Sequence, residues 1–529
     1  MRKLLSSRNR FGLVMVTAGI AVFHAAAQAQ SLTPSANPPS GVAGVNDSYV
    51  TGSGFPAGTI TGSSVIFGTT CAAPSVATAP VLQVAVEGVL RRFEFLIPAT
   101  LATGTYYVWV TGTAGTTAFN TLNTPSCSKI QVTATTTTLA ACVPTSSLAV
   151  TAGTNVNAYV PFGSWAEGGK TGIEEVPLEG TGTAMNFVTT GLVNSCASNS
   201  VTGEVVCTEN NTNVDLINGS TLTTITSGSN TFADFSGGNC ENCGVGINAA
   251  NNTAVIAMGL VGGGAGEFGG SSGVQVLNLA SNTFNAPVPL THNVSEDISI
   301  DSTRNLVLSP SEDGFYDLLK IGAGNTLTEY TNNLYPSVAP FPYLDSAAED
   351  CTTGIAMASD EDSDGIYITD LTQATFTAGS PGTWTAPGQF ITLNDGGYSA
   401  GTCGISSAPG SGHLAVVTGE FGGSSYSALQ LPSTSGTGTP TLVDYAYVAS
   451  MPTTPDGNAF SAGYDPHTIT AYTSPNTNKS YAVMVDWLFD YPSYLGVVDL
   501  ACVLALPRTA GTHTVIGNAS TCTRYVAVP

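Results

Sequence analysis

The heptapeptide GEFGGSS occurs twice in the sequence, at residues 266–272 and again, letter for letter, at residues 419–425. Both copies belong to a longer pattern of apolar strand, polar turn, second apolar strand, loop and a closing Leu- or Val-rich strand. The pattern recurs seven times at a period of roughly 50 residues, and a unit of this size is too small to bury its own faces. The copies begin near Ser147, Ser195, Cys243, Asp297, Cys351, Cys403 and His467.

This repeat predicts seven small sheets that stack as the blades of a β-propeller over residues 144–529. Both heptapeptides would follow the second strand of their blade. They lie three blades apart, which places them roughly opposite one another across the ring. They are either Gly-rich hairpin loops retained from a duplication, or loops in which Glu267 with Phe268, and Glu420 with Phe421, present matched acidic and aromatic side chains to a ligand.

Residues 30–132 show a different pattern of short strands broken by Gly and Pro, which is typical of an immunoglobulin-like sandwich. The segment resembles the IPT/TIG family, whose exported modules are spacers or binding modules, so the resemblance implies no catalytic residue. The Thr-rich stretch 133–143 has little to bury and is predicted to be a linker. The matching motifs are Gly-Ser-Gly-Phe at 52–55, Phe67-Gly68, Pro98, and Gly-Thr-Tyr with alternating Val at 104–110.

The predicted fold is therefore all-β: an N-terminal immunoglobulin-like (IPT/TIG) sandwich followed by a seven-bladed β-propeller. The 60 glycines and the low share of charged residues, 9%, agree with short strands and tight turns rather than long helices. The phrases "GINAANNTAVIAM…VQVLNL" and "TSPNTNKSYAVMVDW…LGVVDL" resemble the YVTN/lactonase-like propeller superfamily, although the Tyr-Val-Thr-Asn consensus is absent. This resemblance implies the fold more than an activity.

Residues 1–29 have the form of a bacterial secretory signal peptide, with four basic residues, an apolar run from Phe11 to Ala27 and the cleavage sequence Ala27-Gln28-Ala29. Its removal leaves nine basic against 36 acidic side chains. Such a surface repels phosphate backbones and anionic lipid, which argues against nucleic-acid and membrane partners. We expect a secreted, periplasmic or cell-surface protein.

Eleven cysteines in an exported chain are expected to form disulfides rather than to bind metal. The first and last predicted pairs each lie within one domain, the second bridges neighbouring strands, and the third bridges neighbouring blades. Because the number is odd, at least one thiol has no partner within the chain. The predicted pairs are Cys71 with Cys127, Cys196 with Cys207, Cys351 with Cys403, and Cys502 with Cys522.

Acidic residues recur where several blades are predicted to enter their innermost strand, on the face that also carries the loops between second and third strands. Converging carboxylates repel one another unless a cation or protons intervene, and dense oxygen ligands suit Ca²⁺. Alternatively, these acids cap strand ends or accept hydrogen bonds from backbone amides. The candidate calcium ligands are Glu241, Glu296, Asp297, Glu349, Asp350, Asp465 and His467.

The same face is expected to carry aromatic side chains beside a carboxylate, which suit stacking on sugars or other flat ligands: Trp165, Trp487, Asp490 and Tyr491. A further acidic cluster, residues 359–370, starts like a calcium loop but lacks the closing carboxylate. We expect it to form an acidic hairpin turn on the opposite face, with weak Ca²⁺ binding as the alternative.

Three functional classes follow. The leading hypothesis is a non-enzymatic exported protein that binds a small-molecule, glycan or protein partner through the channel face of the propeller. The alternatives are a calcium-dependent, lactonase-like hydrolase in the channel mouth and a structural envelope component. Catalytic signals are weak, because the four histidines that follow the signal peptide are scattered in sequence.

Overall fold

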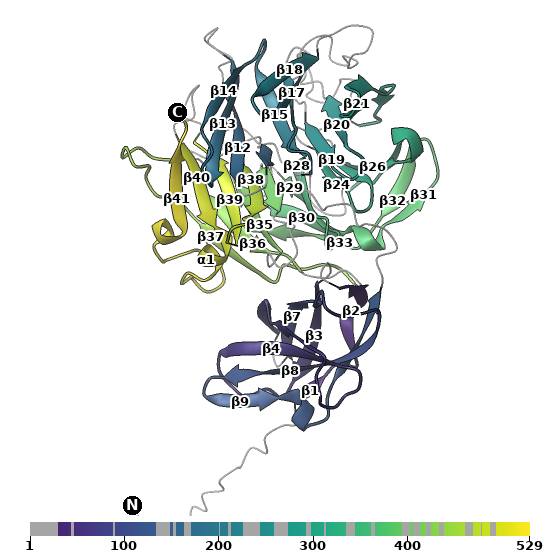
Figure 1. Cartoon of the computed structure of the whole chain (residues 1–529), viewed down its shortest axis with the longest axis vertical. Helices are drawn as coiled ribbons and strands as arrows, with labels where there is room; N and C mark the ends of the chain where they lie inside the picture. Colours follow the sequence, from purple (N-terminus) through teal and green to yellow (C-terminus); the bar gives the residue numbers. More distant parts are fainter. Residues whose placement is uncertain are drawn as a thin grey trace, which may run out of the picture.

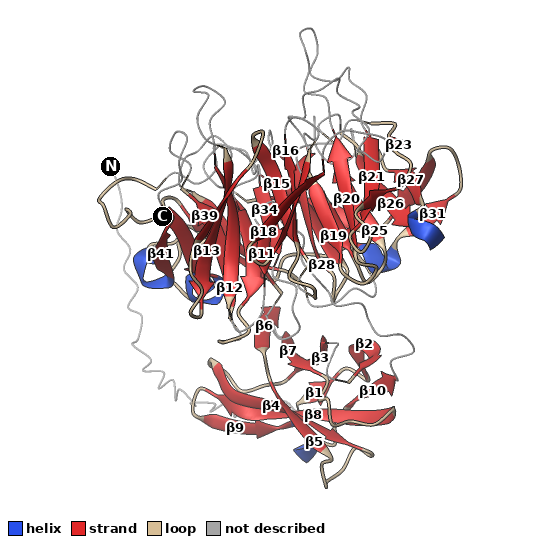
Figure 2. Cartoon of the chain, turned by 45° about the horizontal axis from the view of Figure 1, so that its top comes forward, coloured by secondary structure: helices blue, strands red, loops and turns tan. Residues whose placement is uncertain are grey.

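The computed structural model consists almost entirely of β-strands, which form a small N-terminal sandwich and a ring of seven sheets (Figures 1 and 2). The predicted fold class is therefore confirmed. The structure describes residues 30–43, 47–87, 90–133, 149–151, 155–162, 171–199, 201–209, 213–225, 244–258, 273–292, 298–311, 314–334, 344–360, 365–393, 402–405, 413–418, 425–432, 438–460, 469–477, 479–486 and 494–529.

The N-terminal sandwich is built from two sheets that share strand β2, which pairs in parallel with β10 and antiparallel with β3. Its core is aromatic: the ring of Phe55 lies 5.0 Å from that of Phe93 and 5.2 Å from that of Phe119. Its strands are β1 (Ser31–Leu32), β2 (Ser35–Val42), β3 (Asp47–Ser53), β4 (Ile60–Gly68), β5 (Ala77–Pro80), β6 (Gln83–Glu87), β7 (Leu90–Leu96), β8 (Gly104–Ala114), β9 (Thr117–Asn120) and β10 (Ser128–Thr133).

Each blade of the propeller is an antiparallel sheet of strands that are consecutive in the chain or nearly so. Blades one to three comprise β11 (Ala149–Thr151), β12 (Val156–Phe162), β13 (Gly172–Glu179) and β14 (Met185–Val188); β15 (Val193–Ser198), β16 (Val205–Glu209), β17 (Val214–Asn218) and β18 (Thr221–Ile225); and β19 (Val245–Asn248), β20 (Thr253–Met258), β21 (Gly273–Asn278), β22 (Thr283–Phe284) and β23 (Val288–Pro289).

The remaining four blades continue in chain order around the ring. They comprise β24 (Ser299–Asp301), β25 (Leu306–Pro310), β26 (Tyr316–Ile321) and β27 (Leu327–Thr331); β28 (Leu344–Asp350), β29 (Ile355–Asp360), β30 (Gly365–Asp370) and β33 (Gly388–Thr392); β34 (Thr402–Ile405), β35 (Leu414–Thr418), β36 (Tyr426–Gln430) and β37 (Asp444–Val448); and β38 (Ile469–Thr473), β39 (Ser480–Val485), β40 (Tyr494–Asp499) and β41 (Thr523–Ala527).

A separate apolar cluster fills each junction between neighbouring blades. In β20, Ala254 and Ile256 pack against blade two, whereas Val255 and Ala257 pack against blade four. Successive side chains of a strand point to opposite faces of its sheet, so a strand with neighbours on both faces must be apolar throughout. This explains why the second strands read as continuous apolar runs.

The ring closes between blades seven and one by the same kind of packing. Val156 and Ala158 of β12 lie in one cluster with Val483 and Val485 of β39. Strand β41 pairs with β40 and is the fourth strand of blade seven. Within the described residues, the strands of blade one all come from the segment 149–188.

One hairpin departs from the simple repeat. Strands β31 (Thr375–Thr377) and β32 (Gly382–Thr385) are inserted in blade five but extend blade four, because β32 pairs in parallel with β27. Trp384 of this hairpin is buried between the two blades and donates a hydrogen bond from Nε1 to the carbonyl oxygen of Tyr316 at 2.7 Å. The insertion therefore fastens blade five to blade four.

Two predictions about blade five are wrong. Its innermost strand is β28, which ends at Asp350, so the predicted start of the blade at Cys351 falls in the following turn. The acidic segment 359–370 joins the second strand to the third, with Asp360 paired to Gly365, and so does not lie on the opposite face from those loops. Both differences have one cause: β28 contains small and acidic residues, so that the apolar β29 resembles an innermost strand more closely.

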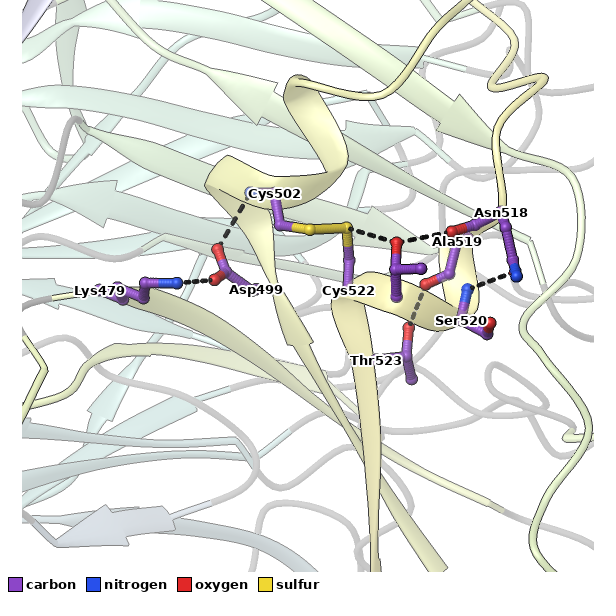
Figure 3. Close-up of a disulfide and its surroundings, with 9 residues drawn as sticks. Lys479, Asp499, Cys502, Asn518, Ala519, Ser520, Cys522 and Thr523 are labelled. Carbon is purple, nitrogen blue, oxygen red and sulfur yellow. Dashed lines mark hydrogen bonds and ion pairs between the residues drawn. A yellow bond between two sulfur atoms is a disulfide. The ribbon is translucent and has the colours of Figure 1, made fainter.

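Three of the predicted disulfides are present, and Cys351 is also disulfide-bonded, although the side chain of Cys403 lies outside the described residues. Figure 3 shows Cys502–Cys522, which joins α1 (Leu500–Leu504) to the 3₁₀ turn η5 (Ala519–Cys522) before β41. Asp499 caps α1 by accepting a hydrogen bond from the backbone nitrogen of Cys502 at 3.0 Å. The disulfide thus anchors the last strand.

Glu179 links blades one and seven and gives a first prediction. It accepts hydrogen bonds from Tyr472 Oη at 2.9 Å, Ser474 Oγ at 2.7 Å and Asn476 Nδ2 at 2.8 Å. Burial raises the pKa of Glu179, but these bonds and the charge of Arg524 outweigh it, so the pKa is lowered. A depressed carboxyl pKa stabilises the fold above the unfolded value and loses this contribution as the pH falls.

We expect Glu179→Gln to lower the free energy of unfolding by about 1–2 kcal/mol at neutral pH. The difference from the unsubstituted chain should shrink as urea denaturation is repeated at pH values further below the ordinary glutamate pKa, because protonation of Glu179 removes its contribution. Lys479→Gln removes an exposed ion pair with Asp499 on the same blade and should change stability by less than about 0.5 kcal/mol. An equal effect of both substitutions at neutral pH would contradict this role of Glu179.

Candidate functional site

The two ends of the blades differ in what covers them. The described turns between first and second strands lie toward the N-terminal domain (Figure 2), and we call this the proximal end. The second strands end, and the third strands begin, at the other end of the antiparallel blades, which we call the distal end. The strands that flank both GEFGGSS copies, β20 with β21 and β35 with β36, end and begin there.

Of the residues nominated from the sequence, Glu349 and Asp350 belong to the part of the chain that the structure describes. They end β28 at the proximal end, so the expectation that they mark the entry to an innermost strand is wrong. Both are buried. The other nominated residues lie outside the described residues: Glu241, Glu267, Phe268, Glu296, Asp297, Trp165, Glu420, Phe421, Asp465, His467, Trp487, Asp490 and Tyr491.

Several turns at the proximal end share one backbone conformation. In four blades the residue directly before the second strand has a positive φ: Asn252, Asn305, Gly354 and His413. Asn tolerates this left-handed conformation better than most residues, and glycine adopts it freely. At position 354 a Cβ atom would also approach Cζ of Arg304 to 2.5 Å, so a larger residue would displace the guanidinium group.

Side chains of these turns link each blade to the next. Asn199 of blade two donates to Asn252 of blade three at 2.8 Å, and Asn248 of blade three donates to Asn305 of blade four at 3.1 Å. Arg304 of blade four then donates to the carbonyl oxygen of Cys351 in blade five at 3.3 Å. We call this chain of contacts the turn belt, and it extends from blade two to blade five.

His413 continues the turn belt to blade six and connects it to the N-terminal domain. Its Nδ1 contacts a carboxylate oxygen of Asp350, and its Nε2 lies 2.9 Å from Oε1 of Glu94 in β7. The side chains of all three residues are buried. An imidazole with a carboxylate at each nitrogen can donate to both only when it is protonated. The contact therefore places a buried imidazole between one carboxyl group of the propeller and one of the N-terminal domain.

Three buried carboxyl groups, those of Asp301, Glu349 and Asp350, interact with one another near this contact. Burial raises the pKa of Glu349 well above its ordinary value, and the charges of Asp301 and Asp350 add to this, while a hydrogen bond from Ser299 opposes it. Burial likewise raises the pKa of Asp301, opposed by Arg304, whose Nη1 lies 2.7 Å from Oδ2. The raised pKa of Glu349 favours its neutral form, which weakens the repulsion between these neighbouring carboxyl groups.

The structure reveals a second cluster that the sequence analysis missed. His292, Asp317 and Glu329 offer three ligand atoms that all lie within 4.8 Å of one another, and this is the metal-compatible group found among the described residues. His292 follows β23, Asp317 lies in β26 and Glu329 lies in β27, so the three residues come from three different segments. Only the pairing of β26 with β27, and the packing of blade four on blade three, brings them together.

Comparison with known proteins assigns no family. No family model matches the chain, and no curated protein is similar to it. A solved complex of KlAtg21 with the coiled-coil of AgAtg16 matches 64% of this chain and 95% of that chain, with 13% identity and a TM-score of 0.36. The mitotic checkpoint complex matches 65% of this chain and 87% of that chain, with 10% identity and a TM-score of 0.41.

The fold therefore stands on the seven sheets themselves rather than on these similarities. In the part of the chain that the structure describes, no helix has the length and apolar character needed to cross a membrane.

The His413 contact gives a second prediction. His413→Asn keeps a residue that tolerates the positive φ but removes the imidazole between the two carboxylates. Removing one partner of a buried ion pair is strongly destabilising, and we expect a loss of about 3 kcal/mol in urea denaturation. Small-angle scattering should also show a larger radius of gyration, because the N-terminal domain loses its anchor.

His513→Asn is the matched control, because His513 has the same backbone conformation, with φ 53°, but its side chain is 39% exposed. It should change neither measurement appreciably. Equal stability and equal scattering for the two variants would contradict the interdomain role of His413.

Proposed function

We propose that this chain is an exported, non-enzymatic binding protein that contacts its partner with the distal end of the propeller. The observation that carries the proposal is the buried Glu94–His413–Asp350 contact, which commits the proximal end to the N-terminal domain. The distal end lies at the far side of the ring from that domain (Figure 2). Connections on a rigid β scaffold are where binding residues are most often found.

Three disulfides support the exported part of the proposal, since such bonds persist in oxidising compartments. The chain carries 36 acidic against 13 basic residues. Its field favours a neutral or cationic surface over an anionic one. We therefore propose a glycan or a protein as the partner rather than a phosphorylated or anionic molecule.

The binding role is favoured over a hydrolase by the environment of Glu349 and Asp350. Their carboxyl groups bond to Ser299, Thr352 and His413 inside the protein, so neither faces a substrate. The other candidate calcium ligands lie outside the described residues. Calcium binding by them stays a prediction.

The test compares substitutions at the two ends of the ring. The full chain and the variant Glu267→Ala, Phe268→Ala, Glu420→Ala, Phe421→Ala are applied to a glycan array and to a pull-down from the envelope fraction. We expect the variant to lose at least about tenfold in binding, which corresponds to about 1.4 kcal/mol. Val201→Ser, at an exposed position of a proximal turn, is the matched control and should bind normally.

Unchanged binding by the fourfold variant, or an equal loss in Val201→Ser, would contradict the distal end as the binding surface. Turnover of a lactone panel with added Ca²⁺ would contradict the non-enzymatic role.

A further inference from the structure

The cluster of His292, Asp317 and Glu329 lies in the outer part of the junction between blades three and four. His292 follows β23, the last strand of blade three. Glu329 of β27 is in register with Leu319 of β26, and Asp317 projects from the same face as Leu319, two residues away. Leu319 packs in the apolar cluster between these blades, together with Val288. All three polar side chains are therefore directed into the junction.

The position of each ligand atom is fixed by its surroundings. The imidazole of His292 is stacked on Phe315 with ring centroids 3.5 Å apart and planes inclined by 13°. Its Nδ1 lies 2.9 Å from Oδ2 of Asp317, a buried side chain. Glu329 is held by Thr291, which donates from its backbone nitrogen at 2.8 Å and from its hydroxyl at 2.9 Å. Little reorganisation is needed for the three groups to converge on one ion.

The ligand set selects the class of metal. Ca²⁺ and Mg²⁺ prefer oxygen ligands alone, whereas one imidazole with two carboxylates suits Zn²⁺. Metal–ligand distances of about 2.0–2.2 Å place tetrahedral ligand atoms roughly 3.5 Å from one another. His292 Nδ1 and Asp317 Oδ2 are 2.9 Å apart, and the three ligand atoms all lie within 4.8 Å of one another, which is compatible with this value.

We propose that His292, Asp317 and Glu329 bind a Zn²⁺ ion that bridges blades three and four, with water completing the coordination. The inference does not depend on the proposed binding function, since it concerns the outer part of one blade junction. Two carboxylates brought this close repel each other, and a divalent cation neutralises them. The ion would join the β23 segment of blade three to two strands of blade four.

A similar arrangement in blade six shows why the third ligand matters. His513 is stacked on Tyr445 with centroids 4.0 Å apart, and its Nδ1 lies 4.0 Å from Oδ1 of Asp444. There, however, Arg508 forms two hydrogen bonds of 2.8 Å with the Asp444 carboxylate. The guanidinium already neutralises this carboxylate, so the pair has no need of a metal and provides an internal control.

The test is calorimetric titration of Zn²⁺ into the full chain after removal of metals with EDTA. We expect one site, retained in the presence of millimolar Ca²⁺, and a Co²⁺ complex whose absorption spectrum reports coordination by nitrogen and oxygen. His292→Gln, Asp317→Asn and Glu329→Gln should each weaken Zn²⁺ binding by about 100-fold. His513→Gln should leave it unchanged.

Thermal melting with and without Zn²⁺ shows whether each variant is folded, and the ion should raise the melting temperature of the unsubstituted chain but not of His292→Gln. No calorimetric binding by the unsubstituted chain would overturn the proposal, and would leave His292 and Asp317 as an ion pair. Equal binding by folded His292→Gln and His513→Gln would overturn it as well, because the ion would then be bound elsewhere on the acidic surface.

Discussion

Apolar packing between neighbouring blades is the interaction on which the rest of this molecule depends. Among the described residues, the apolar clusters of the propeller lie between blades rather than within one, because second and third strands bury side chains on both faces, as Ile256 and Val255 do in opposite directions. An isolated four-stranded sheet of this size would leave both faces in water. Closure of the ring between Val156 and Val483 removes the two ends that an open array would expose. The position of every polar site follows from this ring.

Acidic side chains of the propeller lie in two different environments. At the proximal end, Arg304 and His413 lie beside buried carboxyl groups, and the His413 contact joins the N-terminal domain to the propeller. In the outer part of the junction between blades three and four, His292 lies beside two carboxylates in a geometry that suits a metal ion. The first arrangement serves architecture, whereas the second offers a site for an external ligand. Acidic residues that look alike in the sequence therefore have different roles, according to the groups that surround them.

The sequence predicted the number of blades and the disulfides well, because both leave direct patterns: apolar strand pairs such as β20 with β21, and cysteines such as Cys502 and Cys522 within one domain. It failed at β28, whose buried residues Ala348, Glu349 and Asp350 do not look like a core strand. Burial there comes from neighbouring blades, which the local sequence does not report. The cluster of His292 with Glu329 was missed for the same reason, since strand pairing and blade packing, rather than sequence spacing, bring the residues together.

Native-state hydrogen exchange on a variant of the closing junction tests most directly whether the blades form one cooperative ring. Val483→Ala creates a cavity between blades seven and one, which should cost roughly 2 kcal/mol. If closure couples all blades, the slowest amides of β29 in blade five should lose as much protection as those of β12 and β39. A loss confined to blades seven and one, with blade five unchanged, would show an open array of independent neighbours and contradict this account.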